Sequence, residues 1–179
     1  GADAIVDVLL GDYNPGGKLA ITVPRGVGQV PIYYGHKASG GRSQWKTAYV
    51  EMSNKPLYPF GHGLSYTTFL VDNLRVTRSS VRPGEQITLT VDVTNTGTRA
   101  GDEVVQVYVR MPDASVTRPV KELKGFRRLH LAAGERRSVR FVLQVNQCAY
   151  RNEAMQLVVT SGRLELMVGT SSEDLPLRA

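Results

Sequence analysis

The sequence predicts a mainly β protein in which residues 69–179 form an antiparallel sandwich of the immunoglobulin-like or fibronectin-type-III-like kind. Three observations carry this prediction. Apolar and polar residues alternate with period two in four segments, turn-forming residues separate those segments, and a span of about 110 residues fits one sandwich domain. The chain has no Cys…Trp…Cys pattern, so an antibody-type domain is not expected.

Each alternating segment places one set of side chains in the core and the other set on an outer face. The predicted core residues are Ile87, Leu89, Val91 and Val93; Val105, Val107 and Val109; Val139, Phe141 and Leu143; and Leu164, Leu166 and Val168. Their neighbours Gln106, Tyr108 and Met167 are expected on the outer side. The predicted turns are 82–85, 95–97, 133–135 and 161–162, which contain Gly, Pro, Asn or Ser.

The first third of the chain has a different character. Apolar spacing predicts a helix over residues 2–10 that ends at Gly11, and the alternation in residues 19–23 predicts a short strand stopped by Pro24. Residues 25–59 form a predicted long loop. One helix, one strand and a loop cannot enclose a core, so we expect residues 1–68 to belong to a larger body and to expose apolar surface.

Composition narrows the function classes. The 22 basic and 16 acidic residues give a net charge of +6, but the basic residues are scattered, which disfavours nucleic-acid binding. No apolar run is long enough to cross a membrane, and no signal peptide is visible at the start. The single cysteine, Cys148, excludes an internal disulfide and a cysteine zinc site.

No complete catalytic constellation is found. The spacing of His36, His62 and His130 matches no zinc motif, and no pair of carboxylates has a convincing catalytic context. The predicted loop does contain groups suited to sugars, because aromatic faces and hydrogen-bond donors are what sugars need. Four of these are our candidates for the rim of a substrate site: His36, Arg42, Trp45 and Glu51. For Tyr33, Tyr34 and Tyr58 the favoured interpretation is packing of the loop onto a neighbouring domain.

Four strings carry a family resemblance. Residues 11–19 (GDYNPGGKL), 29–34 (QVPIYY), 56–69 (PLYPFGHGLSYTTF) and 118–126 (RPVKELKGF) resemble, in the same order, strings of glycoside hydrolase family 3, with His62 in place of the usual tyrosine. The chain resembles the C-terminal part of such enzymes, and among them bacterial periplasmic β-glucosidases most.

The resemblance implies a domain division and a mechanism. Residues 1–68 would be the C-terminal remnant of an α/β sandwich domain, and residues 69–179 a fibronectin-type-III-like domain. The family's retaining mechanism uses an aspartate nucleophile and a glutamate acid/base, and neither motif matches a position in this chain. The implied activity is hydrolysis of terminal non-reducing β-D-glucosyl, or alternatively β-xylosyl, residues without a cofactor or metal. A periplasmic or secreted location is implied as well.

Three interpretations follow from these observations. In the first, the chain is part of a glycoside hydrolase, its partners are the remaining catalytic domains and an oligosaccharide or β-glucoside, and the isolated fragment is inactive. In the second, it is a stand-alone module that binds carbohydrate or a cell surface. In the third, it is structural and has no ligand. In each case we expect no nucleic acid or membrane partner, and residues 1–68 to be disordered or to make homo-oligomer contacts.

Overall fold

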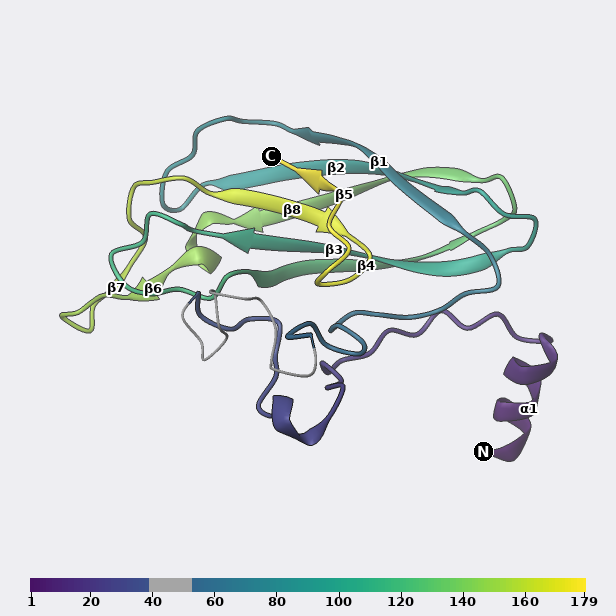
Figure 1. The fold of residues 1–179 in the computed structure, drawn as a ribbon. Helices are drawn as coiled ribbons and strands as arrows, with labels where there is room; N and C mark the ends of the chain where they lie inside the picture. The colour runs from purple at the N-terminus through teal and green to yellow at the C-terminus, as the bar shows by residue number, and fades with distance from the viewer. Residues whose placement is uncertain (39–52) are drawn as a thin grey trace.

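The computed structural model of the 179-residue chain describes residues 1–38 and 53–179. Two antiparallel sheets face each other, and the N-terminal segment runs along the outside of one of them (Figure 1). The three-stranded sheet has the order β1-β2-β5, the four-stranded sheet β4-β3-β8-β9, and β6 and β7 form a small separate pair. The mainly β prediction, with a fibronectin-like sandwich, is confirmed.

The helices and strands have the following bounds. They are α1 (Ala2–Leu10), the 3₁₀ helix η1 (Val27–Gln29), β1 (Phe69–Val76), β2 (Gln86–Asn95), β3 (Gly101–Arg110), β4 (Glu122–Leu131), β5 (Arg136–Gln144), the 3₁₀ helix η2 (Val145–Cys148), β6 (Tyr150–Arg151), β7 (Leu157–Val158), β8 (Glu165–Gly169) and β9 (Leu177–Arg178).

The core lies between the two sheets, as the alternation predicts. On β2 every predicted core residue is at most 4% exposed, and Val105, Val107 and Val168 are fully buried. Register fixes this arrangement, because β2 pairs with β5 continuously from Gln86 opposite Gln144 to Thr94 opposite Arg136. Of the predicted set, only Leu164 stays partly exposed at the end of the core.

Gln106, Tyr108 and Met167 lie on the outer face of the four-stranded sheet, as the alternation predicts. They are nevertheless buried there, at 3%, 0% and 5% exposed, which the sequence did not indicate. The reason is that the N-terminal segment covers this face: the Tyr34 ring lies 5.6 Å from the Tyr108 ring, and Gln106 Nε2 donates to Gly61 O at 3.2 Å. Alternation identifies the two faces of a strand, but it cannot show that a distant segment covers one of them.

Helix α1 has the predicted bounds and ends at Gly11, whose φ of 86° is the left-handed conformation that glycine adopts readily. No residue of the helix is buried, and Ile5, Leu9 and Leu10 are 63%, 74% and 74% exposed. The helix projects away from the sandwich (Figure 1). The expected exposure of apolar surface in residues 1–68 is therefore confirmed for this helix. Within the described residues, no helix is long and apolar enough to cross a membrane.

The predicted strand over residues 19–23 does not form. Only Val23 makes a β-bridge, to Tyr58, and the remaining pairing between residues 19–23 and 57–62 consists of irregular backbone hydrogen bonds. The paired segment contains Pro59 and is preceded by Pro56. Neither has an N–H to donate, so a continuous ladder cannot form there. In the predicted loop that follows, the described residues contain η1 as their one helical turn.

Candidate functional site: the ends of the 39–52 segment

The four predicted rim residues lie in or beside residues 39–52. Arg42, Trp45 and Glu51 fall outside the described residues, whereas His36 is described and partly buried. His36 Nδ1 lies 2.9 Å from the carbonyl oxygen of Lys37. Because a carbonyl can only accept, Nδ1 carries the proton, and Nε2 of the neutral ring is left as an acceptor. A ring in this tautomer can receive a hydrogen bond from a sugar hydroxyl.

The start of the segment is fixed to the sandwich. Val120 N donates to His36 O at 2.9 Å, and Lys37 forms a β-bridge with Pro119. These partners lie in the string of residues 118–126, immediately before β4. The backbone on which the His36 side chain stands is thus held by the fibronectin-like part of the chain.

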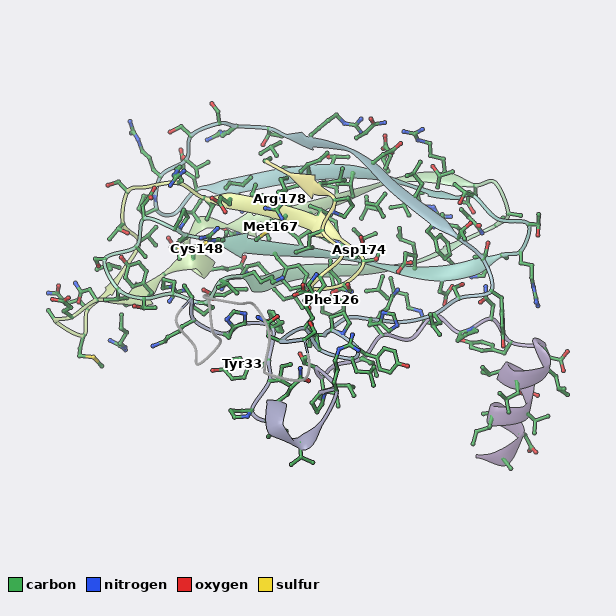
Figure 2. The ribbon with its side chains drawn as sticks, viewed as in Figure 1. Tyr33, Phe126, Cys148, Met167, Asp174 and Arg178 are labelled. Carbon is green, nitrogen blue, oxygen red and sulfur yellow. The ribbon has the colours of Figure 1, made fainter. Side chains whose placement is uncertain are left out.

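Tyr34 anchors the same stretch by packing. Its ring lies 4.5 Å from the Phe60 ring and meets Tyr108 edge-on at an interplanar angle of 80°. Leu123 N also donates to the Tyr34 hydroxyl at 3.4 Å. The packing interpretation is therefore right for Tyr34. Tyr33 is 51% exposed. Figure 2 shows its side chain below the sheets.

The end of the segment is held by Gln29, a residue that we did not predict as important. Its side chain is 3% exposed. Gln29 Nε2 donates to Ser53 O at 2.7 Å and to Lys55 O at 3.2 Å, while Oε1 accepts from Arg25 N. All the polar atoms of a buried amide are thus used to fix the backbone just after residue 52. The signal available in the sequence was its place at the start of the string 29–34.

The described residues at this site leave little space for a ligand of their own. The cavity between Tyr33, His36 and Ser172 has a volume of about 10 Å³, which is at most the size of one water molecule. Lys121 Nζ donates to Ser172 O and pairs with Glu173 Oε1 at 3.1 Å, so the loop between β8 and β9 is tied to the start of β4. The described part of the site is a support for the 39–52 segment.

A second contact region joins helix α1 to the sandwich. Asn14 Nδ2 donates to Ala100 O at 2.9 Å, and Asn14 Oδ1 accepts from Tyr66 N at 2.8 Å. Arg99 donates to Gly11 O, and its guanidinium lies over the Tyr66 ring at 5.7 Å. The negative end of the dipole of α1 lies at its C-terminus, next to Gly11, and this favours the positive charge of Arg99 there.

Glycines permit the close approach of these segments. A Cβ atom at Gly16 would lie 2.4 Å from Asp102 Cβ, and one at Gly61 would lie 2.2 Å from Gln106 Oε1. At Gly63 it would lie 2.4 Å from Gly17 O. Because real Cβ atoms do not come this close to other heavy atoms, a side chain at Gly16 would push the N-terminal segment away from Asp102, and one at Gly63 would push it away from Gly17. At Gly61 a side chain would displace the buried amide of Gln106.

The carboxyl groups with shifted pKa values are all paired with cations or hydrogen-bond donors. Partial burial raises the pKa of Asp102, but hydrogen bonds from His130 and Arg128 outweigh this effect and hold it below its ordinary value. The pKa values of Asp92, Asp113 and Glu135 are lowered as well. A general acid in glycoside hydrolysis needs a raised pKa, so these four groups are suited to ion pairing and not to proton donation.

Two protein-family models match the chain. The glycosyl hydrolase family 3 C-terminal domain matches residues 1–66, and the fibronectin type III-like domain matches residues 103–172. The chain belongs to glycoside hydrolase family 3. It corresponds to the C-terminal part of such proteins, as the four sequence strings predict.

Individual relatives of this family 3 chain agree. A protein named periplasmic beta-glucosidase from Salmonella typhimurium is 42% identical over 96% of the chain, and one named beta-xylosidase from Formosa agariphila is 42% identical over 96%. The solved structure of a β-glucosidase from Erythrobacter marinus gives a TM-score of 0.90 at 42% identity, covering 98% of the chain. The glucose complex of a Listeria innocua β-glucosidase also gives 0.90, at 37% identity over 97%. The chain spans only 23% to 25% of the length of these proteins.

Proposed function

We propose that this chain is the C-terminal part of a retaining, exo-acting β-glucosidase that hydrolyses terminal non-reducing β-D-glucosyl residues. The names of the relatives support this substrate, and β-xylosyl residues are the alternative because one relative is named a beta-xylosidase. Residues 1–68 would complete an α/β domain whose remainder precedes them, and residues 69–179 would be the fibronectin-like domain. The name of the Salmonella relative supports a periplasmic or secreted location.

One observation carries the proposal. Residues 1–68 are fixed to the sandwich on one side, through Tyr34, the backbone of His36 and Asn14, yet they leave apolar residues of α1 largely exposed on the other. A segment that is packed on one side and exposes apolar residues on the other is expected where another domain of the same protein packs against it. This arrangement fits a chain that spans a quarter of its relatives.

In the complete enzyme the chain would support the substrate site without performing the chemistry. Both catalytic carboxylates would lie in the preceding domains, and the carboxyl groups with lowered pKa values described above are consistent with that division. The sandwich would fix the start of the 39–52 segment and Gln29 its end, and together they would present His36, Arg42, Trp45 and Glu51 at the substrate rim. Restricting the positions of such contacts lowers the cost of ordering them when substrate binds.

Activity measurements on 4-nitrophenyl β-D-glucopyranoside and β-D-xylopyranoside test this proposal. We expect turnover by the longer protein, with the glucoside preferred, and none by the pure 179-residue chain. In the longer protein, His36→Ala and Trp45→Ala should raise KM several-fold, whereas His130→Ala at the far end of β4 should leave it unchanged. Turnover by the 179-residue chain alone would refute the division of labour, and an inactive longer protein would refute the proposed activity.

A further inference from the structure

One end of the sandwich has an open cavity that the glycosidase proposal does not use. Its volume is about 340 Å³, within the usual range for small-molecule sites. It lies at the end marked by Cys148 in Figure 2, away from α1. All of its lining residues are described, and none belongs to the support of the 39–52 segment.

The floor of the cavity is the exposed end of the hydrophobic core. Val145 and Cys148 are 5% and 4% exposed there, and partly buried apolar side chains complete the wall; these are Val81, Met111, Val159 and Leu164. The core remains open because β5 does not continue directly into β8. The chain instead leaves through η2 and the short β6–β7 pair before it returns.

The walls are fixed in place by hydrogen bonds. Asp113 accepts from the backbone N of Arg163 at 2.9 Å and from its guanidinium at 3.2 Å, which joins the loop after β3 to the segment before β8. The Tyr150 hydroxyl accepts from Ser115 N at 3.1 Å and pairs with Thr160 Oγ1 at 3.0 Å. A cavity whose walls are linked in this way is preformed, so a ligand need not order them.

The rim carries unbalanced positive charge. Arg163 is neutralised by Asp113, whereas the guanidinium of Arg82, which also lines the cavity, has no partner among the described residues. Of the lining residues, Asp113 is the one with a carboxylate, so the rim has two guanidinium groups and one carboxylate. An apolar chamber beside an unpaired arginine suits a ligand with an apolar body and one anionic end.

We propose that this cavity binds small amphipathic carboxylates, with an aryl or short alkyl body against Val145, Cys148 and Leu164 and the carboxylate on Arg82. An apolar cavity of about 150 Å³ can already hold benzene, so this volume accommodates an aromatic ring with a short chain. For a ligand of about twelve non-hydrogen atoms, the expected dissociation constant is on the order of 1 mM.

NMR titration of the 179-residue chain with 4-phenylbutyrate tests the proposal. We expect saturable amide shifts that cluster on the lining residues, with Val81, Cys148, Gly162 and Leu164 among them. The neutral analogue 4-phenylbutanol should bind at least about 5-fold more weakly, because it lacks the charge that Arg82 would pair with.

A matched pair of variants locates the anionic contact. Arg82→Gln should weaken 4-phenylbutyrate binding about 5-fold, whereas Arg127→Gln, which removes another exposed arginine on β4, should leave the affinity unchanged. Both residues are exposed, so neither change should affect folding. Equal binding of acid and alcohol, equal effects of the two variants, or shifts confined to the exposed residues of α1 would each overturn the proposal.

Discussion

On the outer face of the three-stranded sheet, β2 presents Thr88, Thr90 and Thr94 partly exposed to solvent. On the outer face of the four-stranded sheet, β3 buries Gln106 and Tyr108 beneath the N-terminal segment. The inner faces of both sheets follow the same apolar alternation. The two sheets therefore differ in that only the outer face of the four-stranded sheet is covered by another segment. A buried glutamine and tyrosine in mid-strand mark that face as an interface.

The largest expected effect comes from removing the central polar residue of the covered face. Gln106 accepts from the Tyr108 hydroxyl at 2.7 Å and donates to Thr170 O and Gly61 O. Gln106→Ala would leave these buried groups unpaired and should lower the free energy of unfolding by about 3 kcal/mol in urea denaturation. Thr90→Ala, at an outward position of β2, should change it by less than about 0.5 kcal/mol. If both substitutions lowered the free energy of unfolding equally, the two outer faces would not differ in their contribution to stability.

Asp92 is a buried residue on the otherwise partly exposed outer face of the three-stranded sheet, and replacing it should have the next largest effect on stability. It is 6% exposed and accepts from Ser138, Arg136 and Arg75. Asp92→Asn should lower the free energy of unfolding by about 2 kcal/mol at pH 7. The matched change Asp72→Asn, which loses one exposed pairing with Arg136, should cost less than about 0.5 kcal/mol.

The Asp92 effect should also depend on pH. The Ser138 hydroxyl, followed by Arg136 and Arg75, holds the pKa of Asp92 well below its ordinary value. A folded-state pKa below the unfolded one stabilises the protein above about pH 4, and this contribution is lost as the pH falls toward the folded value. The difference between the original chain and Asp92→Asn should therefore shrink below pH 4. A difference that stays constant down to pH 2 would contradict this account.

A smaller and more local effect is expected where α1 meets the sandwich. Arg99→Gln removes the donor to Gly11 O and the cation above the Tyr66 ring. Amide exchange in α1 should become about 5-fold faster, equivalent to about 1 kcal/mol of local stability, while β2 and β3 keep their protection. Hydrogen exchange with mass spectrometry measures both regions in one experiment. Faster exchange throughout the sandwich would show that this contact contributes to the global fold.

The smallest effect on stability is expected for the exposed residues of α1. Leu9→Gln with Leu10→Gln should change the free energy of unfolding by less than about 0.5 kcal/mol, since both side chains are 74% exposed. The same change should reduce self-association of the chain in size-exclusion chromatography with light scattering. Val142→Gln, at an exposed position on β5, is the control that should not affect association. A chain that is monomeric without any change would contradict the predicted homo-oligomer contacts.

The sequence was most informative where local pattern and tertiary environment agree. Period two identified the core positions of β2 and β5, and helical spacing with Gly11 gave the bounds of α1. It placed Gln106 and Tyr108 on the outer face but could not show that they are buried there, because their burial depends on a segment far away in the chain. It also failed at residues 19–23, because strand pairing depends on the partner, and here the partner contains Pro56 and Pro59.

The candidate site divides in the same way. His36 was predicted from its chemistry, and its backbone lies just before residues 39–52, held by Val120. Gln29 was not found, because a single glutamine has no periodic or catalytic signature and its role exists only through hydrogen bonds to distant backbone atoms. The roles of His36, Arg42, Trp45 and Glu51 in substrate contact stay predictions.

The glycine contacts of the N-terminal segment have a practical meaning for protein engineering. Gly16 fits against Asp102, and Gly61 against Gln106, with no room for even a methyl group. A chimera joined at residue 68 would pair one homologue's glycines with another homologue's strand β3, and any mismatch of side-chain size would force the two apart. A graft that transfers residues 11–68 together with the sandwich keeps these surfaces matched, so the natural unit of exchange between homologues is larger than the β domain itself.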